Sequence, residues 1–188
     1  MKFMRILLAC AVLMTAVLAN AVDPQQYQPK PGETVLVLQI EGQGEVAIRL
    51  ETQKAPKTTA KIIGLAQSGF YNGQKFFKVV NQPKPFIVQF GDPGSKTKDM
   101  SDASLGTGGS GQKVAYEDTG LSNVEGSVGF STPQGDRNGG DSQFYINMNN
   151  NRFLDGNYTV FGMVVKGLDV VKRIKLGDQV TSASIKRG

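Results

Sequence analysis

The sequence of 188 residues contains no histidine, no tryptophan and a single cysteine, Cys10. Without histidine the chain cannot build a Ser-His-Asp or Cys-His triad, a histidine proton shuttle or a histidine-ligated metal site. One cysteine cannot close an intramolecular disulfide or supply a four-thiolate zinc site. Any chemistry must therefore use lysine, arginine, carboxylates, hydroxyls, amides or the backbone, and we expect neither a metal nor a cofactor.

A strong excess of one charge is also missing. The formal net charge is +5, with 20% of residues charged, and no cluster of lysine and arginine with interleaved aromatics occurs. We therefore expect no nucleic-acid partner. The 39% hydrophobic content is typical of one globular domain, and 23 glycines favour many turns and few long helices.

Residues 1–21 have the order of a secretory signal peptide. Lys2 and Arg5 precede an almost entirely apolar run over residues 6–18, and small residues flank Asn20 at the end. The apolar run is shorter than the roughly 20 residues that a transmembrane helix needs. We expect cleavage after Ala21 and an exported protein, periplasmic or secreted.

Two other interpretations of this leader stay open. It can remain uncleaved as a membrane anchor, or it can be lipidated, because Leu7-Leu8-Ala9-Cys10 resembles a bacterial lipoprotein box. Contact with a membrane is expected only in these two cases. A folded scaffold tethered to the membrane by an uncleaved leader is accordingly a third, lesser hypothesis for the function.

The rest of the chain predicts a flexible lead-in over residues 22–33, rich in proline, glutamine and glycine, and one domain over residues 34–188. A helix is expected to begin near Pro56, since proline suits a first helical position, and Gly69 can end it. A second, short helix is expected over residues 167–174. Apolar runs between glycine-rich turns predict strands over residues 34–40, 45–50, 76–80, 86–90, 127–131, 143–147, 159–165 and 180–185.

This pattern indicates an all-β-dominated, closed or nearly closed antiparallel barrel, because closure removes exposed strand edges. Phe76, Phe144 and Phe161 are expected in its core. The glycine-rich loop over residues 106–111 is not a phosphate loop, since no Lys-Ser/Thr pair or helix follows it. Asp136, Asp141 and Asp155 do not have the spacing of a calcium loop.

Two regions carry a family resemblance. The first contains Phe76-Phe77-Lys78-Val79 and Phe86-Ile87-Val88-Gln89; the second contains Ser142-Gln143-Phe144 and the stretch from Phe153-Leu154-Asp155-Gly156 to Val160-Phe161-Gly162. Together they resemble the cyclophilins, a family of peptidyl-prolyl cis-trans isomerases, over residues 35–185. The resemblance implies a closed eight-stranded antiparallel β-barrel capped by two α-helices. It also implies a groove on the outer face, where an apolar pocket holds a proline ring and a cation and an amide face the preceding carbonyl.

The resemblance assigns the residues of this groove. Lys78 and Gln89 fall at the catalytic positions, although the family motif has arginine where Lys78 stands. The substrate-binding positions are Phe86, Ile87, Ser131, Thr132, Tyr145, Phe153, Leu154 and Tyr158. Several of these depart from the usual residue: Tyr145 replaces phenylalanine, Phe153 often tryptophan, Tyr158 a frequent histidine, and Ser131 and Thr132 an Ala-Asn pair.

Replacement of arginine by Lys78 predicts reduced activity. Arginine offers a planar fork of five donors, whereas lysine offers one compact, strongly hydrated charge. We expect a monomeric isomerase acting on proline-containing peptides and on unfolded or folding exported proteins. The alternative is a catalytically weak peptide-binding or chaperone-like module on the same fold.

Overall fold

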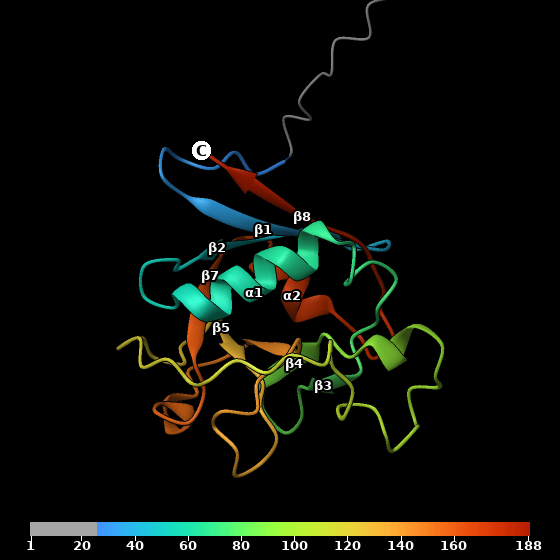
Figure 1. The fold of residues 1–188 in the computed structure, drawn as a ribbon. Coiled ribbons are helices and arrows are strands. Elements are labelled where there is room, and N and C mark those ends of the chain that lie inside the picture. Colours follow the sequence, from blue (N-terminus) through green and yellow to red (C-terminus); the bar gives the residue numbers. More distant parts are fainter. Residues whose placement is uncertain (1–25) are drawn as a thin grey trace, which may run out of the picture.

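The computed structural model describes residues 26–188, so the predicted signal peptide and residues 22–25 lie outside the described residues. Eight antiparallel strands form one strongly curled sheet in the order β3-β4-β6-β5-β7-β2-β1-β8, accompanied by two α-helices (Figure 1). This confirms the predicted eight-stranded antiparallel architecture. The strands are β1 (Thr34–Ile40), β2 (Gly44–Leu50), β3 (Lys78–Val80), β4 (Ile87–Phe90), β5 (Ser127–Phe130), β6 (Phe144–Asn147), β7 (Val160–Lys166) and β8 (Val180–Arg187).

The regular ladders leave β3 and β8 at the two ends of the sheet. The gap between them is bridged by backbone hydrogen bonds from residues 73–76 to residues 177–180. The Gly73 N–H donates to the Val180 carbonyl at 2.8 Å, and the Phe76 N–H donates to the Asp178 carbonyl at 2.9 Å. Phe76, predicted as part of a strand, therefore precedes β3 and serves this bridge instead.

Helix α1 (Pro56–Gln67) begins at the predicted proline. It ends in a Schellman motif, in which the Phe70 N–H donates to the Leu65 carbonyl at 3.0 Å and the Gly69 N–H donates to the Ala66 carbonyl at 3.1 Å. Gly69 has a φ of 72°, the left-handed conformation that glycine adopts without strain. The second helix, α2 (Leu168–Arg173), also lies where the sequence predicts it.

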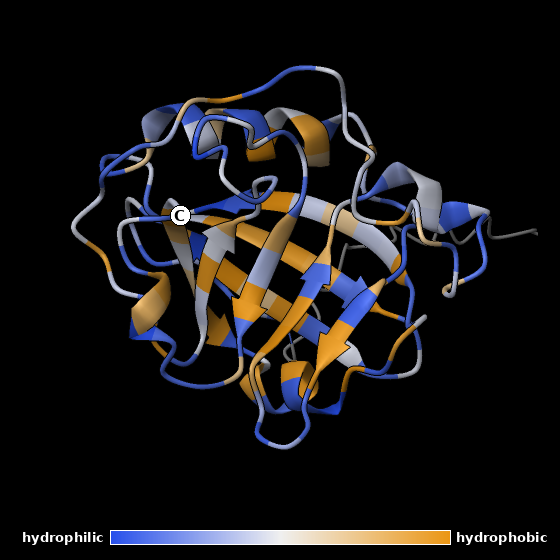
Figure 2. Cartoon of the chain, turned by 90° about the horizontal axis from the view of Figure 1, so that it is seen from below, coloured by the Kyte–Doolittle hydropathy of each residue, from blue (hydrophilic) through white to orange (hydrophobic). Residues whose placement is uncertain are grey.

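The core lies inside the curled sheet and beneath the helices. Phe76, Phe144 and Phe161 are at most 1% exposed, which confirms the prediction for all three. Hydrophobic segments, in orange, recur along the strands among hydrophilic ones, while the loops are mostly hydrophilic (Figure 2). None of the helices within residues 26–188 is long and apolar enough to cross a membrane.

Residues 26–33 belong to the segment predicted as a flexible lead-in, and here they make specific contacts with the sheet. The Tyr27 N–H donates to Glu45 Oε1 at 2.8 Å, and the Tyr27 hydroxyl donates to Glu33 Oε2 at 2.9 Å. The Tyr27 side chain packs on a small apolar cluster formed by Val35, Val37 and Ala47. This part of the lead-in therefore covers one patch of the sheet.

Candidate functional site

One row of cross-strand partners runs over four strands of the sheet. Lys78 on β3 pairs with Gln89 on β4, Gln89 pairs with Tyr145 on β6, and Tyr145 pairs with Gly129 on β5. Residues directly opposite each other in antiparallel strands point to the same face. The row therefore brings Lys78, Gln89 and Tyr145 onto one face of the sheet.

The neighbouring row shows which face this is. Val88, Ile146 and Val128 follow one another across β4, β6 and β5, and they are at most 1% exposed in the core. Because successive residues of a strand alternate between faces, the row with Lys78 points out of the barrel. The strand register thus presents a cation, an amide and an aromatic ring together on the outer wall.

This outer wall is hollowed into a groove of about 690 Å³. Nine of the ten predicted site residues line it: Lys78, Phe86, Ile87, Gln89, Ser131, Thr132, Tyr145, Leu154 and Tyr158. Phe153 is not among the lining residues. Its side chain is 71% exposed and stacks on the Phe86 ring with centroids 5.7 Å apart, so it stands at the rim.

Tyr145 is almost fully buried and forms part of the apolar surface of the groove. Its ring meets Tyr158 edge-on, with centroids 5.6 Å apart. It lies across Gly129, where an added Cβ atom would come within 2.2 Å of Tyr145 Cζ. Burial raises the pKa of the Tyr145 hydroxyl well above its usual range, helped by nearby Tyr158 and Asp155. The hydroxyl is therefore a neutral donor, and it donates to Asn123 Oδ1 at 2.8 Å.

The orientation of the Gln89 side-chain amide follows from its neighbours. Gln143 Nε2 donates to the Gly108 carbonyl at 2.7 Å, which turns Gln143 Oε1 toward Gln89. Gln89 Nε2 then donates to Gln143 Oε1 at 3.0 Å and to Ser131 Oγ at 2.9 Å. Both amide hydrogens of Gln89 are used, so the atom left for a ligand is the acceptor Oε1.

Lys78 is exposed and contributes to the groove from β3, next to β4. Within residues 26–188 no carboxylate lies within 4.0 Å of its ammonium group, whereas five other cations form ion pairs. The positive charge of Lys78 is therefore available to a ligand.

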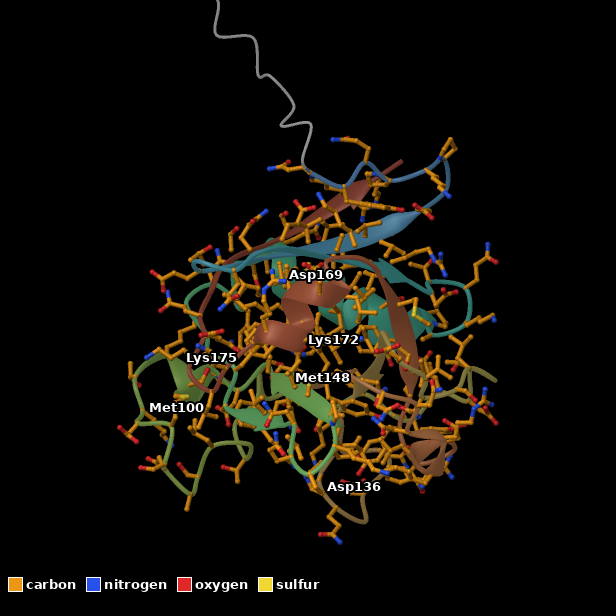
Figure 3. The ribbon with its side chains drawn as sticks, turned by 180° about the vertical axis from the view of Figure 1, so that it is seen from behind. Met100, Asp136, Met148, Asp169, Lys172 and Lys175 are labelled. Carbon is orange, nitrogen blue, oxygen red and sulfur yellow. The ribbon has the colours of Figure 1, made fainter. Side chains whose placement is uncertain are left out.

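The opposite wall of the groove consists of residues that the sequence did not assign to it. Gly106, Thr107, Gly108 and Gly109 line the groove together with residues of the loop from Pro133 to Asp141. Asp136 lies on this second loop, which projects from the molecule on the side away from β1 and β8 (Figure 3). The glycine-rich character of the first loop was the signal in the sequence, but it bore only on a phosphate loop, which the sequence excludes.

Two carboxylates occupy the N–H groups of that glycine-rich loop. Buried Asp92 accepts from the Gly106 N–H at 2.7 Å and the Gly108 N–H at 3.0 Å, while Asp141 accepts from the Ser110 N–H at 2.8 Å. An added Cβ atom at Gly108 would lie 2.4 Å from Asp92 Oδ1, so only glycine permits this approach. The N–H groups of Gly106, Gly108 and Ser110 are therefore already bonded and not free to cradle a phosphate.

Asp155 has a comparable role next to Leu154. Its Oδ1 accepts from the Asn123 N–H at 2.7 Å and from Asn123 Nδ2 at 2.9 Å, and its Oδ2 accepts from Ser122 Oγ at 2.7 Å. Partial burial acts to raise the pKa of Asp155, but these hydrogen bonds prevail and hold it below its usual range. In the part of the chain that the structure describes, no three acidic or thiol side chains gather as metal ligands.

Comparison with protein families gives one match over nearly the whole described chain. Residues 35–187 match the family of cyclophilin-type peptidyl-prolyl cis-trans isomerases. A probable peptidyl-prolyl cis-trans isomerase from Brucella suis is 34% identical over 194 residues, covering 99% of this chain and 92% of that protein. A peptidyl-prolyl cis-trans isomerase from Helicobacter pylori is 33% identical over 74% of this chain and 79% of its own length.

Solved structures agree with the fold. A crystal structure of a cyclophilin-type peptidyl-prolyl cis-trans isomerase from Cryptosporidium parvum superposes with a TM-score of 0.70 at 21% identity, covering 83% of this chain and 99% of that one. The same protein in the presence of the dipeptide Ala-Pro gives a TM-score of 0.69 at 21% identity, covering 82% of this chain and 99% of that one.

Proposed function

Because the chain belongs to the cyclophilin family of peptidyl-prolyl cis-trans isomerases, we propose that its outer groove isomerises Xaa-Pro bonds of exported proteins, and does so more slowly than with arginine at position 78. The observation that carries this proposal is the row Lys78–Gln89–Tyr145, which sets a free cation beside an amide and an aromatic surface.

The reaction needs no proton transfer and no covalent intermediate. Delocalisation of the nitrogen lone pair gives the peptide bond a rotational barrier of about 18–20 kcal/mol. In the twisted transition state that lone pair is localised on the proline nitrogen. A donor placed at this nitrogen, or a charge that favours the twisted carbonyl, lowers the barrier, and its effect is greater where water is excluded.

We assign the donor role to the ammonium group of Lys78. Lys78 lies opposite Gln89 in the β3–β4 ladder, and the unoccupied Gln89 Oε1 is an acceptor that can hold the ammonium group against the substrate. Lysine directs one compact charge, whereas arginine could bond the amide and the substrate at once through its fork. This difference is the physical basis of the lower rate.

We assign substrate binding to the remaining lining residues. Phe86, Ile87 and Leu154 form the apolar surface around Tyr145 that would receive a proline ring. Ser131 and Thr132, at the end of β5, stand where the peptide backbone would run. The Cryptosporidium parvum structure obtained in the presence of Ala-Pro supports a proline-containing ligand.

Exported substrates are proposed from the leader alone. A cleavable signal peptide over residues 1–21 would carry the domain to the periplasm or the outside of the cell, where folding proteins contain unfavourable proline isomers. There the protein would act on unfolded or folding chains.

The test is an exchange measurement between the cis and trans forms of an Xaa-Pro peptide, made by NMR on protein that begins at Val22. The wild type is expected to accelerate exchange, and Lys78→Ala is expected to slow it about tenfold or more, the value of one hydrogen bond to a charged group. Exchange no faster with the wild type than without protein would refute the isomerase site.

The alternative of a peptide-binding module has one observation in its favour, namely the single ammonium at position 78. It predicts a peptide Kd that is the same in the wild type and in Lys78→Ala, together with negligible turnover in both. Peptide binding without acceleration of exchange would favour this module over the enzyme.

A further inference from the structure

Asn123 is a buried amide behind the groove that neither the motif nor the lining of the groove singles out. Its exposed fraction is 0%, and it lies on the loop that leads into β5. A fully buried amide must have its polar atoms satisfied, because an unpaired buried donor or acceptor is costly. The partners of Asn123 therefore report what it holds together.

The first partner is the Tyr145 hydroxyl. It donates to Asn123 Oδ1 at 2.8 Å, and Tyr145 itself is 3% exposed. The Tyr145 ring packs against Gly129, and the hydroxyl is the only polar atom of its side chain. The hydrogen bond to Asn123 thus fixes the direction of the ring and keeps its hydroxyl turned away from the groove.

The second partner is the short 3-10 helix η2 (Arg152–Leu154), which carries Leu154 on the groove and Phe153 at its rim. Asn123 holds both ends of this segment. The Asn151 N–H donates to the Asn123 carbonyl at 2.7 Å before the segment, and the Asn123 N–H and Nδ2 donate to Asp155 Oδ1 after it.

These bonds also fix which way the Asn123 amide points. Because Asp155 is a carboxylate it only accepts, so Nδ2 must face it and Oδ1 must face Tyr145. Asn147 Nδ2 adds a second, longer bond to the same Oδ1 at 3.2 Å. One residue therefore joins the aromatic floor of the groove to its aliphatic wall in a defined orientation.

We infer that Asn123 is a positioning residue, which sets the gap between Tyr145 and Leu154 and so the fit of the proline ring. It does not touch the substrate and acts only through these two residues. The inference rests on the proposed function, because it assumes that the proline ring enters between them. It predicts that loss of the Asn123 amide weakens substrate binding more than it slows the bond rotation.

The experiment is a double-mutant cycle with Asn123→Leu and Tyr145→Phe, read as KM and kcat in the peptide exchange assay. Asn123→Leu leaves the tyrosine hydroxyl buried without an acceptor, so the ring must shift. We expect KM to rise about tenfold in the Tyr145 protein but about threefold or less in the Tyr145→Phe background, with kcat changing less than KM.

Ser122→Ala is the matched control, because it removes one hydrogen bond from Asp155 without touching Tyr145 or Asn123. We expect its KM to stay within about twofold of the wild type. If Asn123→Leu does not fold, Asn123→Ser replaces it in the cycle, since serine is too short to reach the Tyr145 hydroxyl.

Three results would overturn the inference: equal KM changes in both backgrounds, a loss of thermal stability with unchanged KM, or a control as impaired as the Asn123 variant. A wild type that neither binds peptide nor accelerates exchange would instead end the proposed function. If the wild type is active but the KM effects of Asn123→Leu and Tyr145→Phe are additive, only the positioning role of Asn123 is refuted.

Discussion

Restoring arginine at position 78 is expected to raise the isomerisation rate. Lys78 is exposed and has no carboxylate partner within residues 26–188. It lies opposite Gln89 in the β3–β4 ladder, and both hydrogens of the Gln89 side-chain amide are used, so its oxygen Oε1 is the atom left to accept. Lys78→Arg keeps the charge and the length but adds a planar fork, which can bond Gln89 and the substrate at the same time. The substitution therefore adds one charge-assisted hydrogen bond in the transition state.

The magnitude follows from that one bond. A hydrogen bond to a charged group contributes about 1.5–3 kcal/mol, and an exposed, water-screened position favours the lower end. At about 1.4 kcal/mol per factor of ten, kcat/KM should rise about tenfold. The peptide Kd should change less than about twofold, because the added bond forms mainly as the carbonyl twists.

The assay is NMR exchange on one Xaa-Pro peptide, with Lys57→Arg on α1 as the control because that exposed lysine lies outside the groove. The control should leave kcat/KM unchanged. The reasoning is refuted if Lys78→Arg alters kcat/KM by less than about twofold, or if it acts equally on the peptide Kd.

Three further predictions concern the walls of the groove. Gly129→Ala should destabilise the fold by about 1–3 kcal/mol in denaturant unfolding and raise KM, because its Cβ would collide with Tyr145; an unchanged KM would contradict this. Asp92→Ala leaves the N–H groups of Gly106 and Gly108 without their acceptor, so it should lower the unfolding free energy by about 2–4 kcal/mol and raise KM. An unfolding free energy and a KM equal to those of the wild type would contradict the role of Asp92. The pKa of Asp155 is lower in the folded protein than in the unfolded chain, so the carboxylate contributes to folding stability above about pH 4, and this contribution is lost as pH falls further. Asp155→Asn should therefore flatten the acid side of the curve of unfolding free energy against pH. An unchanged curve would contradict this role of Asp155.

Local patterns in the sequence were sufficient to predict the helices and strands. The proline at position 56 and the glycine at position 69 delimit α1 in the structure as they do in the sequence, because both act through their own backbone geometry. Phe144 and Phe161, expected in the core from the sequence, are at most 1% exposed. The bounds of most predicted strands differ from the observed ones by one or two residues. At β3 a distant partner explains the difference, because the Phe76 N–H bonds to the Asp178 carbonyl instead of joining the strand.

The residues of the site also divide into those that the sequence predicted and those that it did not. Matching motifs led to Lys78, Gln89 and Tyr145, and the strand register brings them together because they are successive cross-strand partners. Asn123 and Asp92 gave no such signal. Each of them acts by accepting or donating hydrogen bonds across more than ten residues of chain, and a polar residue in a loop looks the same whether it is buried or solvated.

The sequence by itself thus determined the approximate strands, the helices, the family and nine of the residues that line the groove, because each depends on a short pattern or on side-chain chemistry. The tertiary structure alone decided that Phe153 stands at the rim, that two aspartates accept from the amides of the glycine-rich loop, and that Gln89 Nε2 donates to Ser131 and Gln143, which leaves Oε1 as the atom open to a ligand. Those outcomes depend on which distant atoms meet once the sheet has curled, and no local stretch of residues specifies them.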